Sequence, residues 1–532
     1  MTEGRKSAMS TGNSGASHED VSLGEVSGGV IEALSTGLYD NIRDVIREYV
    51  QNSYDAIRAQ YGKRKSGGVI RISVDKRRNT VTIADNGCGM NRESLIQGIN
   101  IGYSSKGRED VGFRGIGMLA GWALAEKIVV LTKPSASAGC WKAEIRAKEI
   151  LQEIESAKNQ RENLSVRDIF NKYVSVSEER VTKLPTFPEG HGTLVVLEKI
   201  GESHADLLRE DSIMEHLSKV APVAFLPRDD FDHSTAITRQ VMEQVDYFSP
   251  VRIEVNGTQV FKPYRNEDVT EDPSFKLICS RDGKKLAFIW YLIRNRSSRN
   301  PETRGLRLFL KGFRIGDEDY VQNQLVTFKP ANLSYWVLGE VYVVSEGVMP
   351  TSDRNRLKDN DARSTLRRYL GEFGSTLEKE VRDRSERNTA LKDSEEARVR
   401  ARKAVRMTTT EDLTLTEAAE IVKDVKESRK KVESHLKALE RKGDLATIEL
   451  SGMRKTIKDC QKAEKSLIEC ADNDEDVLKL GHQMAKTYRI LKRVVNRFPF
   501  DEYAGSRSGS VSKIRADLMT ALGRALAALG DD

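Results

Sequence analysis

The sequence predicts a multidomain protein of mixed α and β structure (α/β, or α+β) that ends in an all-helical bundle or coiled coil. Its 532 residues are too many for one hydrophobic core, so about three domains are expected. Helical and strand-like patterns alternate up to about residue 361. Beyond that point Gly and Pro become scarce, while Glu, Lys, Arg, Ala and Leu dominate.

The predicted domain limits follow these changes in pattern. Residues 1–27 are rich in Ser, Gly and Thr and are expected to form a disordered lead. Residues 28–230 form the first domain, and a polar, partly helical segment at 150–188 is inserted in it. Residues 240–361 form a second α+β domain, and residues 362–532 form charged helices.

In the first domain, apolar residues recur at helical spacing within residues 30–61 and predict a helix. Residues 69–74 and 80–84 predict a hairpin that turns near residues 77–79. Residues 112–126 are expected to begin as a glycine-rich loop and to continue as an apolar helix. Further strands are predicted at 127–131, 141–146 and 192–198.

In the second region, strand-like runs occur at 251–255, 286–291, 306–310 and 337–344. The last region carries a heptad-like seam, which is typical of helices that pack side by side. The seam consists of Ala418, Ile421, Val425, Val432 and Leu439.

Composition favours a soluble protein, because 31% of the residues are charged and 38% are hydrophobic. The longest apolar stretch, near residues 118–131, is interrupted by Glu126 and Lys127, so neither a membrane span nor a secretion signal is expected. The five cysteines show no C-x-x-C pattern, which fits a reducing cytoplasm. The net charge of +6 permits a nucleic-acid partner without requiring one.

Four short segments carry candidate chemistry, and the first lies in the predicted helix. Glu48 and Asn52 are four residues apart, so they project from one helix face. A carboxylate and an amide placed side by side can hold a water and a divalent cation next to a phosphate chain. Taken alone, the same pattern also fits an ordinary surface helix.

The second segment joins a strand end to a glycine turn. Asp85 ends the strand at 80–84 and can accept a hydrogen bond from an exocyclic amine. Gly87 and Gly89 would let the backbone approach a flat ligand closely. The alternative is a plain tight turn after a strand.

The third and fourth segments are glycine-containing as well. Residues 111–119 hold three glycines whose backbone N–H groups can bind an anion, although a flexible loop has the same composition. Upstream, Lys106 lies in a polar stretch that could act as a lid near phosphate. Thr193 follows Gly192 where a strand begins, and its hydroxyl could join a water network around a base.

Together, the four segments resemble the motifs of the GHKL ATPases, which include gyrase B, the ninety-kilodalton heat-shock chaperone, histidine kinases and MutL. The patterns are E-x-x-x-N-x-x-D-A at 48–56, D-x-G-x-G at 85–89, G-x-x-G-x-G at 112–117 and G-T at 192–193. The resemblance covers about residues 28–225. It implies a Bergerat α/β sandwich, with helices over a mixed sheet and Mg²⁺-bound ATP between them, rather than a P-loop or Rossmann site.

The resemblance also implies a role for individual residues. Glu48 would be the general base that orients the attacking water, Asn52 would bind Mg²⁺, and Asp85 would receive the adenine amine. Thr193 would support the base edge, and Gly89 would let the adenine ring sit close. The remaining nucleotide contacts would come from Asp55, Ala56, Gly87, Met90, Lys106, Gly112, Phe113, Arg114, Gly115, Ile116 and Gly117, of which the glycines at 112, 115 and 117 would wrap the phosphates as part of a closing lid.

Within the family, a histidine kinase is disfavoured, because His18 is the one histidine before the first motif. Residues 343–357 resemble the segment of the heat-shock chaperone's middle domain that supplies an arginine to the γ-phosphate. By that match Arg354 is the candidate, Arg356 is a close rival, and a solvated basic loop is the alternative.

The sequence therefore predicts a chaperone-like remodelling ATPase similar to HtpG, in which ATP closes the lid and two chains associate transiently. A protein partner or client is expected, and the helical tail would be the dimerisation or partner-binding element. The rival interpretation is a protein similar to MutL or MORC that uses ATP to switch a nucleic-acid-associated activity. The segment after residue 362 matches neither the chaperone's C-terminal domain nor that of MutL.

Overall fold

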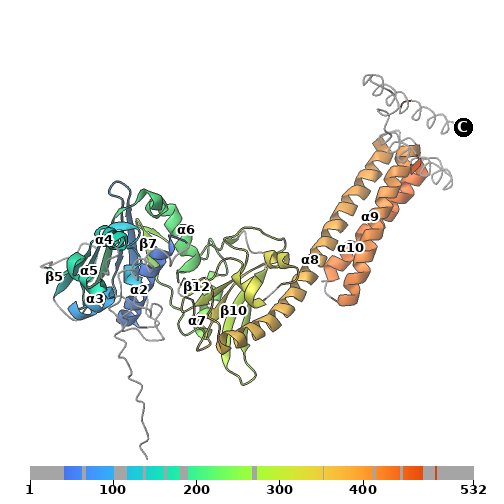
Figure 1. The fold of residues 1–532 in the computed structure, drawn as a ribbon. Coiled ribbons are helices and arrows are strands. Elements are labelled where there is room, and N and C mark those ends of the chain that lie inside the picture. Colours follow the sequence, from blue (N-terminus) through green and yellow to red (C-terminus); the bar gives the residue numbers. More distant parts are fainter. Residues whose placement is uncertain are drawn as a thin grey trace, which may run out of the picture. The chain divides into compact units, whose positions relative to one another are not determined.

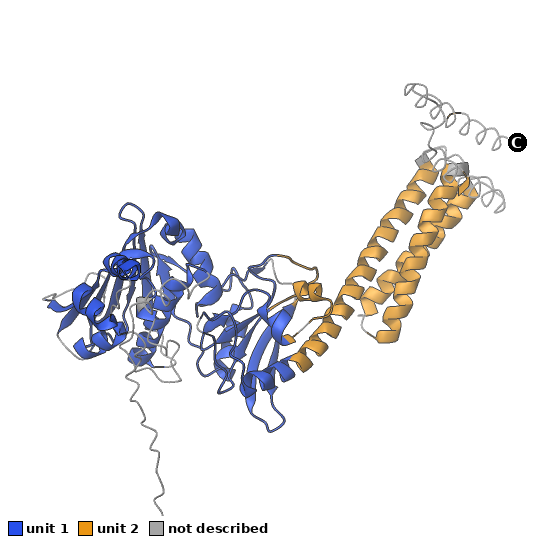
Figure 2. Cartoon of the chain, in the orientation of Figure 1, with its two compact units in different colours: residues 1–292, 300–325, 339–370 blue, residues 293–299, 326–338, 371–532 orange. Residues whose placement is uncertain are grey.

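The computed structural model describes most of the chain from residue 41 to residue 470. The described ranges are 41–62, 67–100, 117–135, 139–160, 165–179, 190–266, 272–326, 328–351, 353–410, 415–443 and 447–470, together with 486–487 and 520. Two compact units can be distinguished (Figure 2). The first consists of residues 1–292, 300–325 and 339–370, and the second of residues 293–299, 326–338 and 371–532.

A large mixed sheet forms the centre of the N-terminal part. Its eight described strands have the order β5-β4-β3-β6-β2-β1-β7-β8. Neighbours run antiparallel, except that β1 and β7 are parallel. The strands are β1 (Val69–Asp75), β2 (Thr80–Asp85), β3 (Ala125–Lys133), β4 (Cys140–Ile145), β5 (Val174–Glu179), β6 (Gly192–Ile200), β7 (Arg252–Val255) and β8 (Thr258–Gln259).

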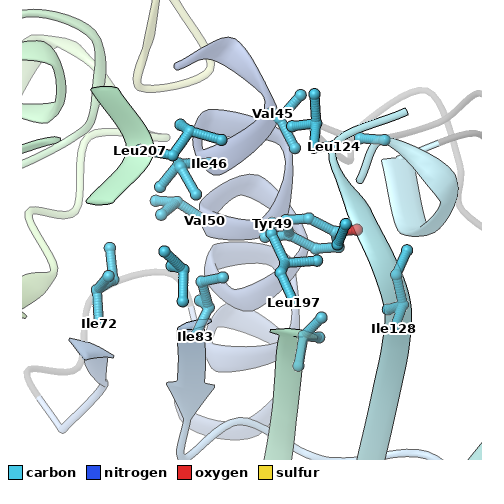
Figure 3. Packing of buried hydrophobic residues seen from close by; sticks show 14 of the residues in the cluster. Val45, Ile46, Tyr49, Val50, Ile72, Ile83, Leu124, Ile128, Leu197 and Leu207 are labelled. Carbon is cyan, nitrogen blue, oxygen red and sulfur yellow. The ribbon is translucent and has the colours of Figure 1, made fainter. Parts of the chain in front are cut away.

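Helix α2 (Asp44–Tyr61) packs its apolar face onto this sheet (Figure 3). Val45, Ile46, Tyr49 and Val50 recur at helical spacing, and all four are buried against strand residues of the sheet. The helix ends at Gly62, whose φ of 80° suits a residue without a Cβ atom. Burying one face of α2 leaves Glu48 and Asn52 only partly covered.

The other helices of this part are α3 (Arg92–Ile99), α4 (Ala147–Gln160), α5 (Val166–Tyr173), α6 (Glu210–Val220) and α7 (Ser234–Gln244). Two short 3₁₀ turns, η1 (Gly117–Leu119) and η2 (Glu202–Leu208), accompany them. Local chemistry sets some of the starting points: Asn91 Oδ1 accepts from Ser94 N at the start of α3, and Ser165 Oγ accepts from Asp168 N at the start of α5.

Two expectations about this part were wrong, and the expectation for the polar insertion was incomplete. The segment after residue 117 is a single 3₁₀ turn followed by turns, not an apolar helix, because Gly121 N donates to Tyr49 Oη (3.0 Å) and ties the chain to α2. The polar insertion is helical in part, as expected, with α4 and α5, but it also contributes a strand, β5, at the edge of the sheet. Strand β7 pairs with β1 and extends the first sheet, although it was expected in the second region.

A second sheet has the strand order β12-β11-β13-β10-β9. It contains β9 (Ser274–Cys279), β10 (Lys285–Ile293), β11 (Gly305–Leu310), β12 (Phe313–Ile315) and β13 (Val337–Val343). A π-helical turn, η4 (Val321–Val326), and a 3₁₀ turn, η5 (Ala331–Trp336), lie between β12 and β13. The multidomain α/β class predicted from the sequence is confirmed, whereas the predicted domain limits remain predictions.

Three long helices follow: α8 (Asp361–Thr410), α9 (Leu415–Lys442) and α10 (Thr447–Cys470) (Figure 1). An alanine stripe on α8 packs with apolar residues of α9 and α10 in one core. The predicted seam lies in the packed faces of α9, since Val425, Val432 and Leu439 are buried in this core. None of the helices in the described part of the chain has the length and apolarity that crossing a membrane requires.

Candidate functional site

Asp85 lies at the end of β2. Its carboxylate is buried between helix α2, which carries the first motif, and the glycine turn of the second motif. Ser53 Oγ on α2 donates to Asp85 Oδ2 (2.9 Å), and Gly87 N donates to Asp85 Oδ1 (2.9 Å). Burial raises the pKa of Asp85 to about 6, although these hydrogen bonds, the backbone of Thr193 and nearby His191 act in the opposite direction. The site therefore holds a buried acceptor group that is ionised at neutral pH.

The glycines after Asp85 allow close approach of neighbouring chain. A Cβ atom at Gly87 would lie 2.6 Å from Ala56 Cβ, and Ala56 O accepts from Cys88 N (3.1 Å). Gly89 has a φ of 65°, and a Cβ atom there would lie 2.0 Å from Lys133 O. Glycine was expected at residue 89 to admit a flat ligand, but the structure gives an additional reason, which is contact with the end of β3.

Thr193 lies next to Asp85 in the register of β2 and β6. Its hydroxyl is 3.1 Å from Thr132 Oγ1, which in turn accepts from Met90 N (2.8 Å) and donates to Gly192 O (3.2 Å). The second and fourth motifs are thus joined through one threonine of β3.

Glu48 and Asn52 face the start of η1. A Cβ atom at Gly117 would lie 3.1 Å from Asn52 Nδ2 and 3.6 Å from Glu48 Oε2. The last glycine of the third motif therefore packs directly against both polar residues of the first motif. Gln51 Nε2 also donates to Glu48 Oε1 (3.3 Å).

Arg354 reaches the same carboxylate from the loop after β13. Its Nε is 3.9 Å from Glu48 Oε1, and both side chains are largely covered, with 8% and 12% exposed. Arg354 has a φ of 58°, which is uncommon for a residue with a Cβ atom. Gly316 N donates to Arg354 O (2.9 Å). Arg356, the rival candidate, is exposed.

The loop around Arg354 is held by hydrogen bonds within the loop and by one hydrogen bond from α2. Asp353 Oδ1 accepts from Asn355 N (3.1 Å) and Thr351 Oγ1, and Thr351 N donates to Arg356 O (2.8 Å). From α2, Arg47 Nη2 donates to Asp353 O (3.2 Å), and the same Nη2 is 3.6 Å from Glu48 Oε1. Two guanidinium groups therefore flank Glu48.

Among the predicted site residues, the structure brings together Glu48, Asn52, Ala56, Asp85, Gly87, Gly89, Met90, Gly117 and Thr193, with Arg354 beside Glu48. Asp55 is buried on α2. Lys106, Gly112, Phe113, Arg114, Gly115 and Ile116 lie outside the described residues.

Sequence reasoning missed several described residues that contact the predicted ones. Among them are Arg47, Gln51, Ser53, Thr132 and His191. The hydroxyl of Ser53 donates to the Asp85 carboxylate. Its position next to Asn52 was the one available signal. Thr132 gave no signal, because its partners are distant in the sequence.

Comparison with known proteins places this region in a class. Residues 39–172 match the family model of the histidine kinase-, DNA gyrase B- and HSP90-like ATPases. This is the class that the four motifs predicted, so the resemblance of the N-terminal region to a GHKL ATPase domain is confirmed.

The most similar relatives include Chaperone protein HtpG from three bacteria. The chain is 29% identical to the Pseudoalteromonas translucida protein over 143 residues, which cover 22% of each chain. It is 31% identical to that of Francisella tularensis subsp. novicida over 119 residues (18% of this chain, 19% of the relative). It is 28% identical to that of Sulfurovum sp. over 129 residues (20% and 21%). The similarity thus spans about a fifth of the length of these relatives.

Proposed function

We propose that the chain binds and hydrolyses ATP with Mg²⁺ and uses the cycle to change its conformation. The observation that carries this proposal is the convergence of Asp85, Asn52, Glu48 and Gly117 around one region of the first sheet and α2. The residues present fit the nucleotide. Asp85 is a buried acceptor for an amine, and the glycine at 117 leaves space beside Asn52 and Glu48 that any Cβ atom would reduce.

Within this proposal each residue has one task. Mg²⁺-bound ATP supplies the phosphoanhydride bond that is broken. Asp85 accepts a hydrogen bond from the adenine amine and fixes the orientation of the base. Asn52 offers its amide oxygen to the cation. Glu48 orients a water and accepts its proton, a role that typically contributes about 10²–10⁴ in rate.

Arg354 would act on the same reaction from the second sheet. Its guanidinium lies against Glu48 in this structure. Because a guanidinium donates in a fixed fork, the same group can stabilise negative charge on a phosphoryl group. We also propose that Gly112, Gly115 and Gly117 wrap the phosphates as part of a closing lid, with Lys106 near phosphate. Phe113, Arg114 and Ile116 would add contacts to the nucleotide.

We further propose a chaperone-like remodelling role, in which two chains associate when ATP is bound and a protein client is the partner. Support comes from relatives that carry the name Chaperone protein HtpG and from the second sheet domain that presents Arg354. The proposed limits of the parts are residues 28–230, 240–361 and 362–532.

The test is steady-state ATP hydrolysis by Glu48→Ala. Turnover should fall by about 10²–10⁴ while the dissociation constant for ATP changes little. The matched control is Glu155→Ala, which removes an exposed carboxylate from α4 and should leave turnover unchanged. Unchanged turnover in Glu48→Ala would remove this residue from the mechanism.

A further inference from the structure

Helices α9 and α10 pack side by side as an antiparallel pair (Figure 1). Two ion pairs cross the seam between them. Arg429 Nε on α9 is 2.7 Å from Glu464 Oε1 on α10, and Arg454 Nη2 on α10 is 2.7 Å from Glu440 Oε1 on α9. Arg429 also binds Glu433 (2.6 Å). The acidic side chains at this seam are therefore already neutralised by arginines.

Lysines occupy the outer faces of both helices. On α10 they follow one another at intervals of three and four residues, and on α9 at intervals of four and seven, so each set lies on one helix face. Every member is exposed. The lysine face consists of Lys426, Lys430 and Lys437 on α9 and Lys455, Lys458, Lys462 and Lys465 on α10.

Acidic residues such as Glu433, Asp459 and Glu469 lie within one helical turn of these lysines, but few of them pair with a lysine of the face. Lys465 Nζ is 3.6 Å from Glu469 Oε1. Within the described part of the chain, the other six lysines make no ion pair, whereas lysines 431 and 442 of the same helix α9 pair with acids of α8. Six of the seven lysines thus present positive charge that no ion pair among the described residues neutralises.

We propose that the lysine face binds the phosphate backbone of nucleic acid without sequence preference. Ten residues separate Lys455 from Lys465, a rise of about 15 Å along the helix. Double-stranded DNA carries a negative charge per about 1.7 Å of its axis, so the face spans several phosphates. Lysine ammonium groups supply donors to phosphate oxygens but do not read base edges in a fixed geometry.

An acidic protein segment is the other partner that positive charge could attract, and the composition of the face argues against it. Protein interfaces are enriched in aromatic residues and depleted in lysine at their centre. Neither α9 nor α10 contains a Phe, Tyr or Trp. The face has charge without an aromatic anchor, which fits backbone contacts to nucleic acid. This inference does not depend on ATP hydrolysis.

The test uses the full chain and a fluorescent 30-base-pair duplex of random sequence, titrated at several salt concentrations. The variant is Lys430→Gln/Lys458→Gln/Lys462→Gln. The matched control is Lys379→Gln/Lys392→Gln/Lys403→Gln, three exposed lysines of α8. Circular dichroism of both variants verifies that the helices remain.

For the unchanged chain, the logarithm of the association constant should fall linearly with the logarithm of salt concentration. Because each neutralised phosphate contributes about 0.9 to this slope, the variant should reduce the slope by roughly 3, and the control should keep it. Equal loss in both variants, no binding at low salt, or tighter binding to polyglutamate of similar length than to the duplex would overturn the proposal.

Discussion

Arg354 Nε lies 3.9 Å from Glu48 Oε1, which places a guanidinium from the second sheet beside the proposed general base on α2. The two opposite charges face each other in a largely covered environment. A guanidinium in this position is close enough to act on the chemistry of Glu48. This pairing supports the proposal of Arg354 rather than its rival, the exposed Arg356.

We therefore predict that Arg354→Ala lowers the turnover of ATP by on the order of 10²-fold or more, because transition-state charge loses its donor. The dissociation constant for ATP should change much less. Arg356→Ala is the control, since the Arg356 side chain is exposed and its backbone makes the contacts within the loop. If Arg356→Ala abolished turnover and Arg354→Ala did not, the assignment would be reversed.

A second prediction concerns Gly117→Ala. The new methyl group would lie 3.1 Å from Asn52 Nδ2, so it should displace the Asn52 side chain, and it would be in van der Waals contact with Glu48 Oε2 at 3.6 Å. Turnover should fall at least tenfold, and the Mg²⁺ concentration needed for half-maximal activity should rise. Such losses are typical when a catalytic group is misplaced by a fraction of an ångström to 1 Å.

Gly452→Ala is the control for this substitution. A Cβ atom at Gly452, within α10, meets no other atom within 4 Å. Alanine is favoured over glycine inside a helix by about 1 kcal/mol, so this variant should be slightly more stable and fully active. Full activity of Gly117→Ala with an unchanged Mg²⁺ requirement would show that the contact does not matter for catalysis.

The elements that the sequence predicted correctly are those whose signal is local. The hairpin of β1 and β2 and the packed face of α2 are examples, since periodicity and turn residues lie within a few positions of each other. The partner of β7 could not be predicted in this way. It pairs in parallel with β1, which is far away in the chain, and such pairing is decided by tertiary packing.

The residues of the candidate site show the same difference between local signals and long-range contacts. Motif spacing identified Glu48, Asn52 and Asp85, and the structure brings their neighbourhoods together. Thr132 and Arg47 were not identified from the sequence, because each acts through contacts with residues that lie far away in sequence. The segment after Gly117 was expected to be helical from its apolar residues, yet its contact with Tyr49 overrides that preference.

A third prediction follows from the pKa of Asp85, which burial raises to about 6. The adenine amine donates its proton, so it needs the ionised carboxylate. Below pH 6 the carboxylate takes up a proton and ATP binding should weaken. The pH dependence of the stability contribution is opposite to that of a carboxylate with a lowered pKa. The folded-state pKa of Asp85 lies above the ordinary value of 3.8. Its contribution to stability is therefore largest at low pH and declines as the pH rises toward about 6.

The measurement is the dissociation constant of ATP for the unchanged chain and for Asp85→Asn between pH 5 and pH 8. At pH 7 the substitution should weaken binding by about 10- to 150-fold, which corresponds to about 1.5–3 kcal/mol for a hydrogen bond to a charged group. The ratio of the two constants should shrink by about tenfold between pH 7 and pH 5. Since protonation of ATP affects both proteins equally, a constant ratio would refute the role of Asp85.

The last prediction concerns stability and a buried ion pair in the second sheet region. Lys262 Nζ donates to Glu340 Oε1 (2.8 Å), and both side chains are at most 2% exposed. Tyr264, Trp290 and Tyr342 also donate to this carboxylate. Burial lowers the pKa of Lys262, although the charge of Glu340 acts against that shift. In this buried environment each of the two charges therefore depends on the other as its counter-ion.

Lys262→Met should destabilise the protein by about 3–5 kcal/mol, because it leaves the Glu340 carboxylate buried without its counter-ion. The double variant Lys262→Met/Glu340→Gln removes the uncompensated charge and should recover part of that loss, since the one amide oxygen still accepts from some of the aromatic donors. Urea unfolding followed by tryptophan fluorescence measures both, with Trp290 as a reporter inside the network. The single variant Glu340→Gln is measured as well. If the loss of stability in the double variant equalled the sum of the losses in Lys262→Met and Glu340→Gln, the two residues would be energetically independent and the ion pair would not be the cause.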